Sequence, residues 1–225
     1  MKYTEKELID LRDEVSQMWH LVLSQLEKSK QALLDNDLEL AHEVMAREKR
    51  VDAFELKICN DCENYIALYS PVAVDLRLVL ALFRICGTLE RIGDFAEGIA
   101  RFVIESSSPN MIQTLKEQLQ LQQMFDKVIA MLSESFVLLE SENTKLSGKI
   151  LLKDEGVDAL YGNALQVLAS HVGNYPADAA CALKTMIVLR KIERVGDHCS
   201  NIVEEIVFYV DAKVLKHHHL QDKAK

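Results

Sequence analysis

Apolar residues recur every three or four positions along almost the whole chain, and this spacing restricts the fold more than any other feature. One run is Leu8, Leu11, Val15, Met18, Trp19, Val22 and Leu26, and another is Leu115, Leu119, Met124, Val128 and Leu132. Such spacing places the apolar side chains on one face of an α-helix. Strand-type alternation and hairpin dipeptides are absent, so the sequence predicts an all-α protein.

Short breaks divide this pattern into six predicted helices of about 30 residues each. They cover residues 4–34, 37–69, 71–105, 109–141, 145–173 and 176–211. Ser70-Pro71 and Ser108-Pro109 each indicate a serine N-cap followed by proline at the first helical position. Helices of this length with such short connections fold back on one another as antiparallel neighbours.

Composition and charge narrow the class of protein. No stretch approaches the ~18 uncharged residues of a membrane span, and the charged start MKYTEKELIDLRDE has no signal-peptide core. We therefore expect a cytoplasmic protein without membrane insertion, whose five cysteines stay reduced. A net charge of −9 argues against a nucleic-acid surface and suits cations or a basic partner.

The sequence Glu-Arg-x-Gly-Asp occurs twice, at residues 90–94 and 193–197, with an offset of 103 residues. Upstream, REKRVDAF at 47–54 matches the pattern of LKDEGVDAL at 152–160 with an offset of 106. Repetition at this spacing predicts a tandem repeat of two antiparallel three-helix bundles. The predicted repeats are residues 1–107 and 108–212, and residues 213–225 form a C-terminal tail.

Each repeat carries two acidic pairs spaced i, i+4, and these eight residues are the predicted metal ligands: Glu48, Asp52, Glu90, Asp94, Asp154, Asp158, Glu193 and Asp197. Each pair projects from one helix face, about 20 residues or roughly 30 Å from the turn that joins its two helices. The pairs of one repeat therefore face each other at the same level. Facing carboxylates repel unless a counter-charge is present, and hard cations prefer such oxygen ligands.

Gly93 and Gly196 each precede the last acid of a pair and leave room for an ion, a water molecule or a close neighbour. Tight helix packing is another explanation for these glycines. Two other interpretations of the acids remain open, namely an exposed acidic stripe and a polar contact compensated by arginine. Arg91 and Arg194 project about 100° away from the glutamates that precede them, which disfavours the second interpretation.

The segments PVAVDLRLVLALFRICGTLERIGDFAEGIA (71–100) and KIERVGDHCSNIVEE (191–205) resemble the two signature segments of the PhoU family, accessory regulators of phosphate transport. The resemblance extends over nearly the whole chain. Phe95 and Gly98 stand where the family often has histidine and asparagine, as His198 and Asn201 do in the second copy. These departures leave the two predicted sites open to differ in affinity or in metal.

The resemblance implies multinuclear clusters of divalent or trivalent metal ions on the eight acids, with iron, manganese, magnesium and zinc as candidates. It also implies a homodimer without enzymatic activity. Such a protein negatively regulates phosphate uptake and phosphate-starvation (Pho regulon) signalling by contacting the transporter ATPase and a sensor histidine kinase. The alternatives are a di-metal carboxylate enzyme of the helical-bundle type and a helical scaffold without metal. The single Glu39-x-x-His42 motif weighs against an oxidase, which needs two such motifs.

Overall fold

The computed structural model describes residues 3–106 and 109–214. Within them the chain forms seven α-helices and two short 3-10 helices: α1 (Tyr3–Asp35), α2 (Leu38–Tyr69), α3 (Ala73–Glu105), α4 (Pro109–Leu115), α5 (Leu121–Ser141), η1 (Thr144–Leu146), α6 (Ser147–Asn174), η2 (Pro176–Asp178) and α7 (Ala179–Asp211). No described residue lies in a strand, so the all-α prediction is confirmed. Of the predicted tail at 213–225, residues 215–225 lie outside the described residues.

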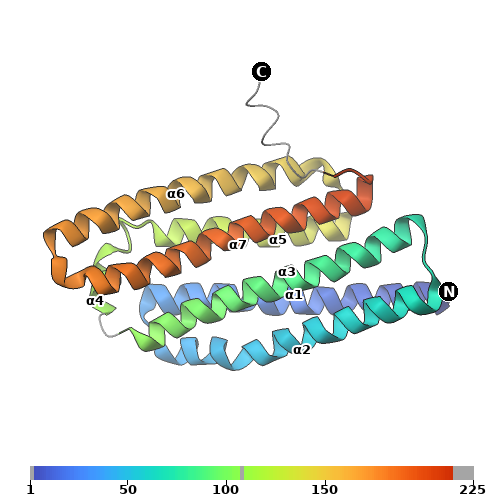
Figure 1. The fold of residues 1–225 in the computed structure, drawn as a ribbon, viewed down its shortest axis with the longest axis horizontal. Coiled ribbons are helices and arrows are strands. Elements are labelled where there is room, and N and C mark those ends of the chain that lie inside the picture. Colours follow the sequence, from blue (N-terminus) through green and yellow to red (C-terminus); the bar gives the residue numbers. More distant parts are fainter. Residues whose placement is uncertain (1–2, 107–108, 215–225) are drawn as a thin grey trace, which may run out of the picture.

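The long helices run along a common axis in two groups of three (Figure 1). Helices α1, α2 and α3 pack against one another, and so do α5, α6 and α7, which confirms the two three-helix bundles. Between the groups, α3 packs against α7 and α1 against α5. Arg77 Nε donates to Tyr209 O, and Arg84 binds Glu205, so α3 and α7 run antiparallel. The boundary at 107/108 stays a prediction.

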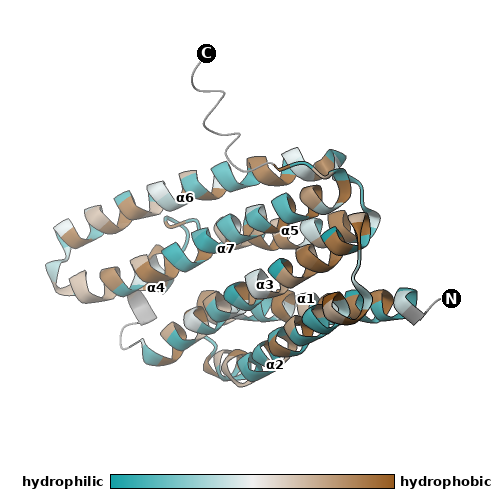
Figure 2. Cartoon of the chain, turned by 45° about the vertical axis from the view of Figure 1, so that its right-hand side comes forward, coloured by the Kyte–Doolittle hydropathy of each residue, from teal (hydrophilic) through white to brown (hydrophobic). Residues whose placement is uncertain are grey.

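The hydrophobic core is one continuous cluster that draws on both repeats. Hydrophobic and hydrophilic residues alternate along each long helix (Figure 2), because one face of each helix packs inward. On α1, Val15, Met18 and Val22 are fully buried. The buried Trp19 Nε1 donates a hydrogen bond of 3.1 Å to Leu132 O, which ties α1 to α5. Within the ranges that the structure describes, no helix combines the length and the apolar character needed to cross a membrane.

The prediction of one uninterrupted helix over 109–141 is wrong. The chain turns at residues 116–120, and Gln120 takes a left-handed conformation with φ 52°. Gln113 Nε2 and Lys116 Nζ each donate 3.2 Å hydrogen bonds to the carbonyls of Leu33 and Leu34 at the end of α1. These contacts hold α4 across the end of the bundle, whereas neither glycine nor proline marks the break in the sequence.

The predicted cap at Ser70 is also wrong. Ser70 ends α2 in a left-handed conformation with φ 45°, and its N–H donates to Ile66 O at 3.1 Å. Helix α3 begins later, at Ala73, after the extended residue Val72. The clear side-chain cap is Asp37, which accepts a 2.9 Å hydrogen bond from Leu40 N at the start of α2. Ser108, the other predicted cap, lies outside the described residues.

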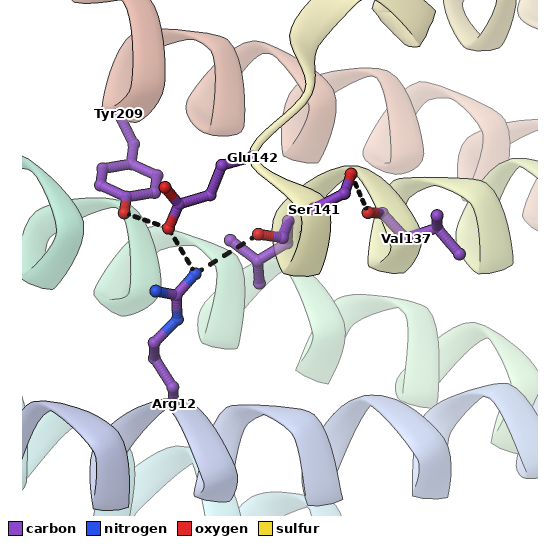
Figure 3. Close-up of polar contacts among 6 residues, drawn as sticks. Arg12, Val137, Ser141, Glu142 and Tyr209 are labelled. Carbon is purple, nitrogen blue, oxygen red and sulfur yellow. Dashed lines mark hydrogen bonds and ion pairs between the residues drawn. The ribbon is translucent and has the colours of Figure 1, made fainter.

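A polar junction joins three helices that are distant in sequence. Arg12 Nη2 of α1 donates to Glu142 Oε1 at 2.9 Å, and Tyr209 Oη of α7 donates to the same oxygen at 2.7 Å (Figure 3). Glu142 follows the last residue of α5 and takes a left-handed conformation. The junction fixes the position of α7 relative to α1 and so helps to set the contact between the two repeats.

Candidate metal centre

The first acidic cluster lies where α2 and α3 of the first repeat face each other. Gly93 marks its inner edge, because a Cβ atom built there would lie 3.5 Å from Glu48 Oε1 and 3.6 Å from Gln25 Oε1. Gln25 is fully buried on α1, and its Nε2 donates to Glu48 Oε2 at 3.3 Å. Val51 Cγ1 would be nearer still, at 3.2 Å. The bare backbone at Gly93 therefore allows α1 and α2, and with them the two oxygens, to approach α3 closely.

The four predicted acids of this cluster influence one another strongly. Burial first, and then the charges of Asp94 and Asp52, raise the pKa of Glu48 to about 7. Burial and the charge of Asp94 also raise the pKa of Glu90. The pKa of Asp94 rises because of burial and the charge of Asp52, although Arg91 opposes the shift. The structure thus brings together the two acidic pairs that the sequence placed at one level.

The second acidic cluster lies where α6 and α7 face each other. Asp154, Asp158 and Asp197 line one groove of about 520 Å³. A Cβ atom at Gly196 would lie 2.5 Å from Asp154 Oδ1, and Ser200 Oγ donates to Asp154 Oδ2 at 2.8 Å. As at Gly93, the glycine provides the room that a carboxylate of the facing helix occupies.

Charge within the second cluster is partly compensated. Glu193 is only 7% exposed, and burial together with the charge of Asp197 raises its pKa to about 7, against the opposing charge of Arg190. Arg190 Nη1 donates directly to Glu193 Oε1. Burial and the charge of Asp197 likewise raise the pKa of Asp158.

Arginine therefore contributes more than the sequence suggested. Arg190, one turn before Glu193, supplies the ion pair that was sought at Arg194. Arg194 instead lies over the ring of Phe95, 5.5 Å from its centroid. Arg91 was expected to point away, yet its long side chain brings Nε to 3.7 Å from Glu90 Oε2.

Three buried oxygen atoms indicate whether these residues suit a cation. In the part of the chain that the structure describes, Gln25 Oε1, Glu48 Oε1 and Glu193 Oε2 are buried without a hydrogen-bond partner. Buried oxygens without partners are costly, and a cation would satisfy them. Over the same residues no three acidic, imidazole or thiol side chains are close enough to enclose an ion. The carboxylates face one another but do not form a closed coordination shell, so the residue types fit a hard cation while the ligand oxygens remain apart.

Four residues near the clusters were not predicted as site residues. Ser200 orients Asp154, Arg190 pairs with Glu193, and Gln25 bonds to Glu48. Glu55 adds a further negative charge that raises the pKa of Glu90. Arg190 was recognisable from its i, i+3 spacing, and Gln25 as a polar residue on the apolar face of α1.

Comparison with known proteins agrees with this architecture. The family model described as the PhoU domain matches the chain twice, at residues 15–103 and 121–206. The "Phosphate-specific transport system accessory protein PhoU homolog" of Aquifex aeolicus is 32% identical over 221 residues, which cover 98% of each chain. The accessory protein PhoU of Escherichia coli is 30% identical, over 94% of this chain and 86% of its own length.

Solved structures show the same fold. The crystal structure of PhoU from Pseudomonas aeruginosa superimposes with a TM-score of 0.84 and 28% sequence identity, over 93% of this chain and 99% of that one. The regulatory protein PhoU of the phosphate transport system of Streptococcus pneumoniae also gives a TM-score of 0.84, with 25% identity over 94% of this chain and 99% of that one. On these grounds the chain belongs to the PhoU family.

Proposed function

We propose that this chain is a metal-binding regulator of phosphate transport without catalytic activity of its own. The Aquifex aeolicus and Escherichia coli relatives are named accessory proteins of the phosphate-specific transport system, and the Streptococcus pneumoniae relative is named a regulatory protein. The chain matches the Aquifex aeolicus protein over 98% of its length, so the likeness is not limited to one shared module. This extent of similarity supports the same role here.

Among the described residues, the buried oxygens Gln25 Oε1, Glu48 Oε1 and Glu193 Oε2, which have no hydrogen-bond partner, are the main support for the metal-binding part of the proposal. Glu48, Asp52, Glu90 and Asp94 hold ions in the first repeat, and Asp154, Asp158, Glu193 and Asp197 hold them in the second. All eight offer carboxylate oxygens, which suit iron, manganese and magnesium, and also zinc. A bound ion neutralises the facing charges and presents a cationic surface that can accept a carboxylate or phosphate group from a partner.

The regulatory part of the proposal concerns partners. In the cytoplasm, when phosphate is plentiful, the protein contacts the ATPase subunit of the phosphate transporter and the phosphate-sensing histidine kinase. These contacts restrain uptake and keep the phosphate-starvation response off, and the acting form is a homodimer. The metal-loaded acidic faces are the surfaces that both partners recognise.

A pull-down from cells grown in high phosphate tests the partner assignment. The wild-type chain is compared with a variant in which the acids of both clusters are replaced by the corresponding amides. We expect the transporter ATPase and the sensor kinase to accompany the wild-type chain and to be lost from a folded variant. Equal recovery with both chains would show that the acidic faces do not recognise these partners, and recovery of neither would count against the regulatory role.

A further inference from the structure

The two acidic clusters occupy equivalent places in the repeats but differ in the residues that surround them. The offset of 103 that aligns Glu90 with Glu193 also aligns Gly87 with Arg190. The offset of 106 that aligns the acids of α2 with those of α6 aligns Glu55 with Tyr161. The neighbouring positions of the two clusters can therefore be compared one by one.

The two clusters differ in charge at the position that Gly87 and Glu55 border in the first repeat. A Cβ atom at Gly87 would lie 3.8 Å from Glu55 Oε1, so this position holds an additional carboxylate, and α3 places no side chain opposite it. In the second repeat the guanidinium of Arg190 lies 5.7 Å from the ring centroid of Tyr161 and also donates to Glu193. An acid beside a glycine in one repeat is thus replaced by an arginine held on an aromatic ring in the other.

The third helix of each bundle differs as well. Beside Gly93, α1 contributes Gln25, whose Oε1 is buried without a hydrogen-bond partner among the described residues. Beside Gly196, the corresponding contribution from α5 is Val128, whose Cγ1 lies 3.8 Å from the Cβ position. An amide oxygen can bind a cation, whereas a valine methyl group cannot.

From these three differences we infer that the clusters are unequal: the first binds a hard divalent cation directly, whereas the second carries its own competing cation, the guanidinium of Arg190. The inference rests on the proposed metal-binding function and assigns a different affinity to each half. In the first cluster Gln25 and Glu55 add oxygen ligands or negative charge. In the second, an incoming ion must displace Arg190 from Glu193 before that carboxylate is available.

The surroundings of Arg190 permit this displacement. Its side chain is 52% exposed, while that of Glu193 is only 9% exposed. The guanidinium can therefore move into solvent while Glu193 stays in place and turns its freed oxygen towards the ion. Glu193 Oε2, already buried without a partner among the described residues, is the second oxygen available for that purpose. The first cluster has a glycine at the position of Arg190. Its own arginine, Arg91, is 65% exposed and lies 3.7 Å from Glu90 Oε2, beyond hydrogen-bond distance, so an incoming ion meets a weaker competitor there.

The test measures each cluster separately in the full-length chain by calorimetric titration with Mn²⁺ in a buffer that does not chelate metals. Two background variants are needed, and in each the four acids of one cluster are replaced by amides. We expect the chain with only its first cluster to bind Mn²⁺ about tenfold more tightly than the chain with only its second, a typical size for such neighbouring effects.

Matched substitutions assign the difference to residues. Arg190→Gln is expected to tighten binding at the second cluster about tenfold, and Gln25→Val to weaken binding at the first by a similar factor. Lys184→Gln is the control, since it removes the same charge from an exposed position on α7. Thermal melting confirms that each variant is folded. If Gln25→Val does not fold, Arg190→Gln at its exposed position still decides the result.

The outcomes separate this inference from the function on which it rests. The inference is supported if the first cluster binds Mn²⁺ more tightly, if Arg190→Gln reduces the difference between the two affinities, and if Lys184→Gln leaves the affinity of the second cluster unchanged. Equal affinities, a tighter second cluster, or an Arg190→Gln effect no larger than that of Lys184→Gln overturn the inequality and leave metal binding intact. Absence of Mn²⁺ binding at both clusters overturns the metal-binding function itself, and the inference with it.

Discussion

Gln25 donates a 3.3 Å hydrogen bond through Nε2 to Glu48 Oε2, which joins the buried face of α1 to the acidic face of α2. The bond uses one oxygen of the carboxylate and leaves Glu48 Oε1 directed towards Gly93. The amide thus orients the carboxylate without neutralising it. In the absence of a cation, the folded chain carries the cost of that buried charge.

Glu48→Gln should change how the stability of the protein depends on pH. The pKa of Glu48 is about 7 in the folded chain and 4.5 as its reference value, so the unfolded chain releases this proton first. Between about pH 4.5 and pH 7 the folded protein therefore loses stability as pH rises. The amide in Glu48→Gln does not titrate, so the variant should not lose this stability. In chelator-treated protein, Glu48→Gln should therefore be more stable relative to the wild type at pH 7.5 than at pH 5. Urea unfolding at both pH values measures this.

The substitution Glu117→Gln is the control for the pH experiment, because it removes an exposed carboxylate in the turn between α4 and α5 that belongs to neither cluster. Its stability should follow that of the wild type across the range. If the free energy of unfolding of Glu48→Gln also changes with pH as that of the wild type does, the pKa of Glu48 is not raised in the folded chain.

Gly196→Ala and Gly162→Ala should have opposite effects on stability. Nothing lies within 4 Å of a Cβ atom at Gly162, so alanine should add about 0.5–1 kcal/mol through its helix propensity. At Gly196 the new Cβ would lie 2.5 Å from Asp154 Oδ1 and would displace the carboxylate that Ser200 binds. We expect Gly196→Ala to lose about 1 kcal/mol, the size of one hydrogen bond. An equal gain at both positions in urea denaturation would show that Gly196 is not a spacer.

Arg84→Ala tests the contact between the repeats. Arg84 Nη1 donates to both carboxylate oxygens of Glu205, at 3.1 and 2.9 Å, and Glu205 is only 9% exposed. Because the arginine side chain is half exposed, we expect a loss of about 1–2 kcal/mol, less than for a fully buried pair. Chemical denaturation measures the loss, and Arg101→Ala is the surface control, expected to change stability by less than about 0.5 kcal/mol. Equal effects of the two substitutions would contradict a structural role for the Arg84–Glu205 pair.

Most of the fold was predictable from the sequence, since it follows from apolar periodicity and short connections. Helix α2 was expected at 37–69 and spans Leu38–Tyr69, with Asp37 as its cap. The break at 116–120 was not predictable, because it depends on hydrogen bonds from Gln113 and Lys116 to the end of α1. Contacts between segments that are distant in sequence leave no local pattern.

The candidate site was predictable in its acids but not in its compensation. Spacing and level placed the pair Glu48/Asp52 opposite the pair Glu90/Asp94, and the charge of Asp94 does raise the pKa of Glu48. The i, i+3 spacing marked Arg190 as a possible partner of Glu193, and Gln25 stood out as a polar residue on the apolar face of α1, but neither pattern showed that these side chains would contact the clustered acids. Both depend on side-chain conformation and on the packing of a third helix, which helical periodicity does not specify.

Elemental analysis of the protein, purified without chelator or nickel, tests the central claim that the acidic clusters hold metal ions. We predict at least about one ion per chain, with a clear loss in the double variant Glu90→Ala, Asp94→Ala, because structural ions bind through these deprotonated ligands. Less than about one ion per chain, unchanged by the double variant, would contradict the account.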